Sequence, residues 1–167
     1  MMPPLQSGTC IVAPILEPRV VLQRLSSLPV EAYQPGETVL AGGSSTGKLL
    51  VMIEGAVEVA RGGVRIAEIA EPGAVFGELA LLLDQPHSAD VRTLAPSTFY
   101  VADGRTILQV DPITALYVAV VLAQRLATVN RHLVEVRGRM AQTDQPRRLF
   151  DETLDNIGRT LRYGPPL

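Results

Sequence analysis

The chain has 167 residues, a length that fits one domain with a proper hydrophobic core. Its net charge of -2 argues against a general nucleic-acid binder, which normally carries a basic surplus. The one cysteine, Cys10, excludes an internal disulfide, and the longest uncharged apolar run, 113–123, is too short to span a bilayer, so we expect a soluble, cytoplasmic protein.

The first part of the chain is expected to be a proline-containing lead-in over 1–18, followed by a short amphipathic helix over 19–28. Pro29 ends this helix. Apolar residues recur at helical spacing within it, namely Val21, Leu22, Leu25 and Leu28.

From residue 30 the pattern changes to short strands separated by turns that contain proline or glycine. Seven or eight such strands predict an antiparallel roll or barrel. The expected fold class is therefore α+β, mainly β: a jelly-roll-like β-roll with an N-terminal helix and long C-terminal helices. The expected strands are 30–33, 38–40, 48–53, 56–61, 64–69, 74–76, 92–94 and 97–101.

The stretch 76–91 changes physical character along its length. Gly77 allows a sharp turn after an apolar strand, and 78–82 are good helix formers. Pro86 stops the helix, and extended chain is expected from His87 onward. A short helix held between two strands is therefore expected. Its unpaired N–H groups near Gly77 and the helix dipole favour negative charge.

This stretch resembles the phosphate-binding cassette of cyclic nucleotide-binding domains, in which F-G-E-L-A-L is followed, after a short gap, by P-R-[S/T/A]-A. The match runs without insertion or deletion. Two more motifs resemble the same family: the aromatic-x-Pro-Gly-[Glu/Asp] turn at 33–37 and the L-[YF]-[VI]-[IL]-x-x-G-x-[VA] strand pair at 49–57. The resemblance extends over about 19–139 and implies the β-roll fold of that family.

The resemblance also implies a ligand, cyclic AMP or cyclic GMP, and roles for single residues. Glu78 would accept a hydrogen bond from the ribose 2′-hydroxyl, and Ser88 would contact the cyclic phosphate. His87 stands where the family has the arginine that pairs with the phosphate, and it offers at most two donors and a pH-dependent charge. No metal ion is expected in this site. The residues expected to bind the nucleotide are Phe76, Gly77, Glu78, Leu79, Ala80, His87, Ser88, Ala89 and, near the base, Thr128 and Asn130.

The residues themselves leave alternatives open at several of these positions. A carboxylate at Glu78 would be favourable at a helix N-terminus even without a ligand. His87 could equally be a solvated or core-edge histidine. Asp90 faces either the ligand, where it would repel a phosphate, or the solvent, because strand alternation is unreliable in a bent cassette. Thr128 and Asn130 are of types that are often simply solvated on a helix.

From residue 103 the pattern becomes helical, with a short helix over 104–110. Asp111 as cap and Pro112 in the first turn then begin a helix that can run to about residue 140. This helix carries one stripe at heptad spacing: Ala115, Ala119, Leu122, Leu126, Val129, Leu133, Val136 and Met140.

The stripe packs either on its own domain or against a second copy of the chain. A homodimer through 112–140 is the favoured interpretation, because a lone helix cannot bury its distal half by itself. The chain resembles catabolite-activator-type regulators, in which the corresponding helix is the dimer axis.

The expected domains are 1–140, which includes the dimer helix, and a tail, 141–167, with a short helix over 148–161. The regulators that the chain resembles continue into a helix-turn-helix domain of several dozen residues. Only 27 residues follow Met140 here, so a stand-alone domain without specific DNA binding is expected.

The favoured function is a non-catalytic regulatory module controlled by a ligand. The alternative is a degenerate relative that keeps the fold and the dimer but binds another anion or nothing. A haem or redox sensor would have to use Cys10, His87 and His132, whose spacing indicates no site. A hydrolase triad of Ser88, His87 and Asp90 is disfavoured, because neighbours on extended chain point apart.

Overall fold

The computed structural model describes residues 17–140, with side chains to residue 138. It divides into two compact units, 1–121 and 122–167, so the division falls inside the long helix. The predicted lead-in with Cys10 and the predicted tail with its short helix lie outside the described residues. The domain boundary expected at residue 140 stays a prediction.

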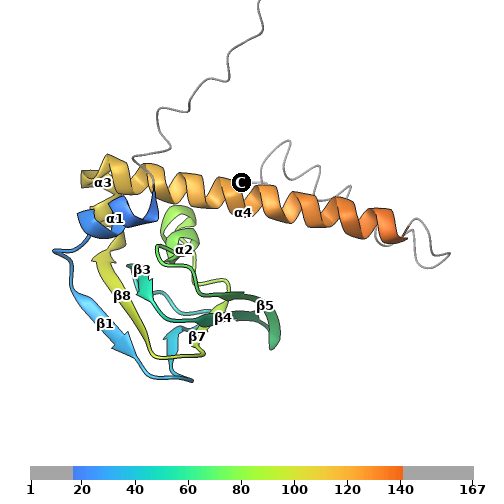
Figure 1. Ribbon diagram of the computed structural model, residues 1–167, viewed down its shortest axis with the longest axis horizontal. Helices are drawn as coiled ribbons and strands as arrows, with labels where there is room; N and C mark the ends of the chain where they lie inside the picture. The colour runs from blue at the N-terminus through green and yellow to red at the C-terminus, as the bar shows by residue number, and fades with distance from the viewer. Residues whose placement is uncertain (1–16, 141–167) are drawn as a thin grey trace, which may run out of the picture. The chain divides into compact units, whose positions relative to one another are not determined.

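Two four-stranded antiparallel sheets form the predicted β-roll (Figure 1). One sheet has the strand order β1-β8-β3-β6, and the other has the order β2-β7-β4-β5. The fold class expected from the turn pattern is confirmed. The strands are β1 (Val30–Tyr33), β2 (Thr38–Leu40), β3 (Lys48–Glu54), β4 (Val57–Arg61), β5 (Val64–Ile69), β6 (Val75–Phe76), β7 (Asp90–Thr93) and β8 (Ser97–Asp103).

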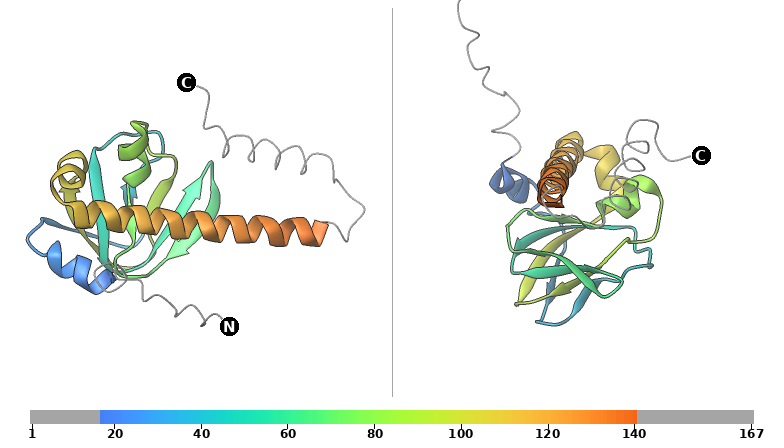
Figure 2. Two further views of the ribbon diagram at one scale, coloured as in Figure 1. Left: turned by 90° about the horizontal axis from the view of Figure 1, so that it is seen from above. Right: turned by 90° about the vertical axis from the view of Figure 1, so that its right-hand side faces the viewer.

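Within residues 17–140, four helices accompany the strands: α1 (Pro18–Arg24), α2 (Glu78–Leu83), α3 (Gly104–Val110) and α4 (Pro112–Met140). In Figure 1 and in the right-hand view of Figure 2, α1, α2 and α3 lie on one side of the roll. The predicted first helix was too long, since α1 ends at Arg24 and Leu25 caps it. The following residues, Ser26 and Ser27, are weaker helix formers because their side chains compete for backbone hydrogen bonds.

The core of the roll is built around Phe99, which is fully buried. Its ring meets the rings of Tyr33 and Phe76 edge-on, at centroid distances of 5.7 Å and 6.1 Å. Such edge-to-face pairs stabilise a core beyond their area burial. The other buried members of this cluster are Val39, Leu40, Leu50, Met52, Val57, Val91 and Val101.

Asp111 begins α4, as the sequence predicts, and also connects α4 to α1. Its carboxylate accepts hydrogen bonds from the backbone N–H of Ile113 and from the hydroxyl of Thr114, at 3.1 Å and 2.9 Å. Arg24 of α1 donates to the same carboxylate at 2.7 Å. The hydrogen bond from Arg24 is the main reason why the pKa of Asp111 falls to about 2.

The first turns of α4 pack through a face that differs from the heptad stripe. Thr114, Tyr117 and Val118 are buried, and the Tyr117 hydroxyl donates to the carbonyl of Gly73 at 2.9 Å. The stripe lies roughly a quarter-turn away, at 3.6 residues per turn. Its members from residue 122 to residue 136 are partly or largely exposed in the single chain, with exposed fractions of 49% for Leu126, 53% for Val129 and 39% for Val136.

By length and composition alone, α4 is also a helix that could cross a membrane. A window of 18 residues in Pro112–Gly138 has a mean hydropathy of 1.5, and 17% of it is buried. The sequence-based expectation that no segment spans a bilayer rested on the uncharged run 113–123. A window of 18 residues in which up to two charged residues are allowed passes the test of length and hydropathy. The finding is weak evidence, since the core helix of a soluble protein passes the same test.

Candidate ligand-binding site

The cassette has the strand–turn–helix geometry predicted from its sequence. Phe76 ends β6 with its side chain in the core, and Gly77 is the N-cap of α2 with φ +87° and ψ -8°. A Cβ atom on Gly77 would lie 2.4 Å from the carbonyl oxygen of Lys48 on β3. The left-handed backbone and this close approach both require glycine.

Glu78 occupies the first position of α2, and its side chain is only 3% exposed. A carboxylate is favoured at a helix N-terminus, which offsets part of the cost of burying it. The next residues turn away from the core, since Leu79 is 43% exposed and Ala80 is half-buried. At the other end of α2, Asp84 pairs with Arg105 of α3.

His87 lies on the buried side of the cassette, with 6% of its surface exposed. Its Nε2 atom is 2.9 Å from the hydroxyl oxygen of Thr46, in the loop between β2 and β3. Its Cε1 atom is 3.7 Å from the point where a Cβ on Gly77 would sit. Burial lowers the pKa of His87 below its ordinary value of 6.5, so the ring is neutral at neutral pH.

Backbone hydrogen bonds of His87 also connect the loop 42–47 to the cassette. The N–H of Gly43 donates to the carbonyl of His87, and the N–H of His87 donates to the carbonyl of Ser44, each at 2.8 Å. The N–H of Gly42 donates to Oδ1 of Asp90 at 2.7 Å. Thr46 was not among the predicted site residues, because a loop of Gly, Ser and Thr has no periodicity that would point to it.

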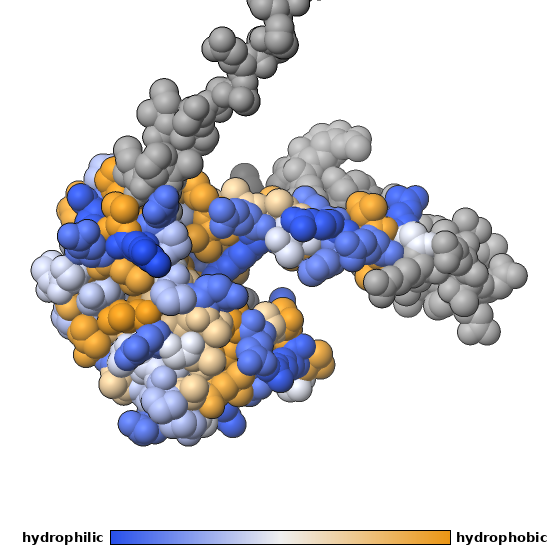
Figure 3. Space-filling view, in the orientation of Figure 1, coloured by the Kyte–Doolittle hydropathy of each residue, from blue (hydrophilic) through white to orange (hydrophobic). Residues whose placement is uncertain are grey.

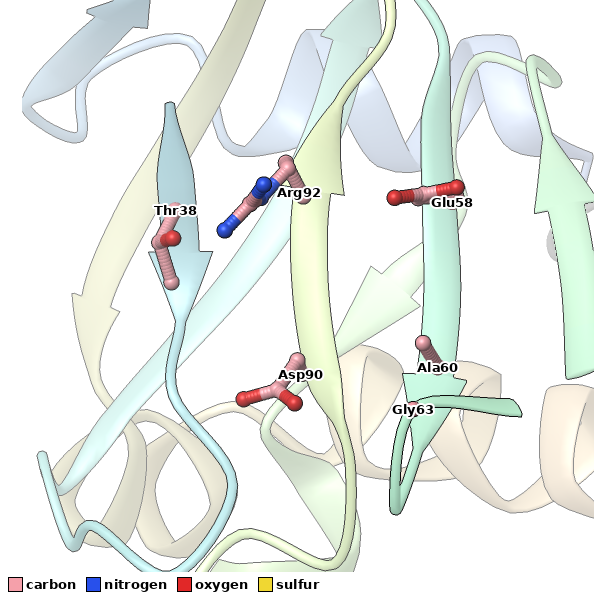
Figure 4. A pocket seen from close by; sticks show the side chains of 6 residues that line it. All are labelled: Thr38, Glu58, Ala60, Gly63, Asp90 and Arg92. Atoms are coloured by element: carbon pink, nitrogen blue, oxygen red, sulfur yellow. The ribbon is translucent and has the colours of Figure 1, made fainter. Parts of the chain in front are cut away.

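Asp90 faces outward, which settles one of the alternatives left open by the sequence. Along β7, Val91 and Thr93 are buried whereas Asp90 and Arg92 are exposed. Figure 4 shows Asp90 and Arg92 projecting from the same face of β7. The carboxylate of Asp90 therefore does not share the buried side of the chain with His87. A hydrolase triad, which the sequence disfavours, would need three converging side chains, whereas His87 is buried and Ser88 and Asp90 are exposed.

A cavity of about 280 Å³ lies on this outer face and does not coincide with the predicted site. Its lining contains three charged residues, and Arg65 forms an ion pair with one of them, Glu58, at 3.9 Å. The face of the roll that Figure 3 shows is a mixture of hydrophilic and hydrophobic residues. The cassette, where the sequence predicts the ligand site, has Glu78 and His87 as buried polar groups. The cavity is lined by Thr38, Glu58, Ala60, Gly63, Asp90 and Arg92.

The structure thus brings Gly77, Glu78 and His87 together, with Thr46 beside the histidine. Ser88 is exposed and Ala89 is half-buried on the strand that leaves the cassette. Thr128 and Asn130 are exposed residues of the second unit. Within residues 17–138, no three His, Cys, Asp or Glu side chains are grouped so that they could hold a metal ion.

Comparison with known proteins agrees with this geometry. The family model of the cyclic nucleotide-binding domain matches residues 30–110. The HTH-type transcriptional regulator Cmr of Mycobacterium tuberculosis (strain CDC 1551 / Oshkosh) is 27% identical over 135 residues, which cover 77% of this chain and 55% of the regulator. The chain therefore spans about half the length of this curated relative.

Solved structures share the fold. The catabolite activator protein of Thermus thermophilus superposes with a TM-score of 0.57 at 22% identity, over 78% of this chain and 61% of that chain. The cAMP-bound structure of PfPKA-R gives a TM-score of 0.55 at 20% identity, over 76% of this chain and 49% of that chain. At these sequence identities, the similarity to the two solved structures establishes the fold of the β-roll and no more.

Proposed function

Because residues 30–110 belong to the cyclic nucleotide-binding domain family, we propose that the protein is a ligand-sensing regulatory module without catalytic activity. It binds a cyclic nucleotide, cyclic AMP or cyclic GMP, at the cassette and passes the signal on through α4. It acts in the cytoplasm. The observation that carries this proposal is the uninterrupted cassette, folded with Glu78 and His87 buried beside the Gly77 turn.

In this proposal each part of the cassette has one task. Phe76 and Gly77 fix the turn, and the first turn of α2 carries Glu78 toward the ribose. His87, Ser88 and Ala89 lie along the cyclic phosphate. The remaining proposed contacts are Leu79 and Ala80 at the start of α2, and Thr128 and Asn130 with the base.

A degenerate relative that binds no nucleotide, or another anion, is the second candidate function. The observation that favours it is the neutral, buried His87 at the position where the family has a permanently charged arginine. Losing a buried charge partner typically costs about 2–5 kcal/mol of binding free energy. In that case the protein would serve as a dimeric interaction domain.

The role of Glu78 can be tested by comparing cyclic AMP with 2′-deoxy cyclic AMP. We expect the wild type to prefer cyclic AMP by roughly 10- to 100-fold, because a hydrogen bond to an ionised acceptor is worth about 1.5–3 kcal/mol. In Glu78→Gln the preference should fall to a few-fold, because a neutral amide oxygen accepts a weaker bond. Calorimetric titration measures both ratios. Glu71→Gln, at an exposed turn, is the matched control, and equal preferences in all three proteins would contradict this role.

We further propose that the chain forms a homodimer through the α4 stripe, which stays largely exposed beyond residue 121 in the single chain. Val129→Glu should convert the dimer to a monomer, because a carboxylate would be buried at a seam position. Val134→Glu is the matched control: Val134 is 72% exposed and lies off the stripe. Sedimentation equilibrium checks both variants. A wild type that is monomeric, or that needs detergent to stay in solution, would contradict the dimer.

A further inference from the structure

The contact between His87 and Thr46 is unusual for a residue expected to hold a phosphate. The ring is buried, and its Nε2 atom is 2.9 Å from the Thr46 hydroxyl rather than exposed toward a ligand. The backbone bonds to Gly43 and Ser44, on either side of the histidine, hold the loop and the cassette in register. The side chain of Thr46 thus occupies one of the two hydrogen-bonding positions on the ring.

Burial lowers the pKa of the His87 ring, and the charged groups nearest to it can be named. Asp90 faces outward and accepts from Gly42, and Lys48 at the start of β3 pairs with Glu31 at 2.7 Å. Arg105 pairs with Asp84 at the far end of α2. Glu78 is the buried carboxylate at the near end of α2, and it would repel an anion. A neutral ring at pH 7 therefore offers no positive charge to a phosphate.

We propose that Thr46 is a positioning residue of the ligand site, which holds the buried ring of His87 through its Nε2 atom, and that binding of a cyclic phosphate releases His87 from Thr46 and adds one proton to its ring. This proposal rests on the function proposed above. The proton comes from solvent: neutral His87, one proton and the anionic ligand give a complex with a charged imidazolium beside the phosphate. No other bond is made or broken.

The proposal predicts that affinity rises as pH falls. The pKa of His87 lies below 6.5 in the free protein, and a nearby phosphate raises it in the complex. At a pH between these two pKa values, the protein takes up close to one proton when it binds the ligand. The affinity for the ligand therefore increases by up to about tenfold when the pH falls by one unit. Below the pKa of the free protein the ring is already charged, and the dependence levels off.

Thr46→Val keeps the shape of the side chain and removes its hydroxyl. We expect this variant to bind cyclic AMP at pH 7.5 about two- to tenfold more tightly, because the hydrogen bond that must be broken on binding is gone. Thr46→Ser keeps the hydroxyl and is the matched control, with little change expected. A threonine with a purely structural role would give weaker or unchanged binding in Thr46→Val, which would overturn the proposal.

Two measurements separate this inference from the function on which it rests. Calorimetry with cyclic AMP at pH 5.5–8, in buffers of different ionisation enthalpy, counts the protons taken up: close to one in the wild type at pH 7 and none in His87→Gln. Uptake near zero with measurable binding overturns the inference and leaves the function standing.

NMR titration of the ligand-free protein, with His132→Gln removing the only other histidine, should give a His87 pKa below 6.5 that moves in Thr46→Val. No binding at any pH overturns both, whatever the NMR result.

Discussion

Replacing His87 by arginine is expected to raise the affinity for cyclic AMP or cyclic GMP at pH 7.5 by roughly 30- to 5000-fold, the equivalent of about 2–5 kcal/mol for a buried charge pair. Arginine carries its charge at every accessible pH and presents a planar fork of donors that matches a phosphate. The wild-type histidine is buried and neutral at this pH, so it brings no charge of its own. Calorimetric titration of both proteins measures the ratio of the two dissociation constants.

His87→Lys is the matched control for this experiment. Lysine restores a fixed charge without the planar fork, so its affinity should fall between those of the wild type and His87→Arg. The arginine variant should also lose the pH dependence of binding, since the titrating group is gone. An arginine variant that binds no more tightly than the wild type would mean that the position does not face the ligand.

Gly77→Ala is expected to have the second large effect, a loss of about 3 kcal/mol or more of the free energy of unfolding, together with loss of ligand binding. The residue has φ +87°, which an L side chain adopts only with strain. The added Cβ would also meet the Lys48 carbonyl at 2.4 Å. Because that atom belongs to the backbone of a central strand, the start of α2 must move and carry Glu78 with it. Urea unfolding and calorimetry measure the two losses.

Gly36→Ala provides the control for backbone strain alone. Gly36 has nearly the same dihedral angle, φ +86°, but a Cβ there would meet nothing within 4 Å. Its expected cost is about 1–2 kcal/mol, with binding retained. If the two variants lost equal stability and both still bound ligand, the close approach of Gly77 to β3 would not matter for the site.

Much of the fold could be predicted from the sequence because its signals are local. Turn residues and short apolar runs indicated the strands, and the glycine followed by good helix formers indicated α2. Asp111 and Pro112 marked the start of α4 for reasons confined to one helical turn. The resemblance of the cassette to a known motif placed Gly77, Glu78 and His87 in one site, and the structure brings these three residues together.

The contacts that the sequence did not reveal join residues that are far apart in the chain. Arg24 and Asp111 form an ion pair across 87 positions, and Thr46 meets His87 across 41. No periodicity or spacing encodes such pairs, because they depend on how helices and loops pack in the folded chain. The strand expected over 92–94 begins two residues earlier, at Asp90. The extended chain expected from His87 onward does not join it, because the backbone of His87 pairs with the loop at Gly43 and Ser44 instead.

Binding of a cyclic nucleotide at this cassette is tested most simply by calorimetric titration of the wild-type chain with cyclic AMP and with cyclic GMP at pH 6.0. Protonation of His87 costs less free energy at this pH than at neutral pH. We expect saturable binding of at least one of the two nucleotides, with one ligand per chain. Binding seen only in His87→Arg would identify a pocket that has lost its phosphate partner. No binding by either protein would contradict the account and leave the cassette as an element of the fold.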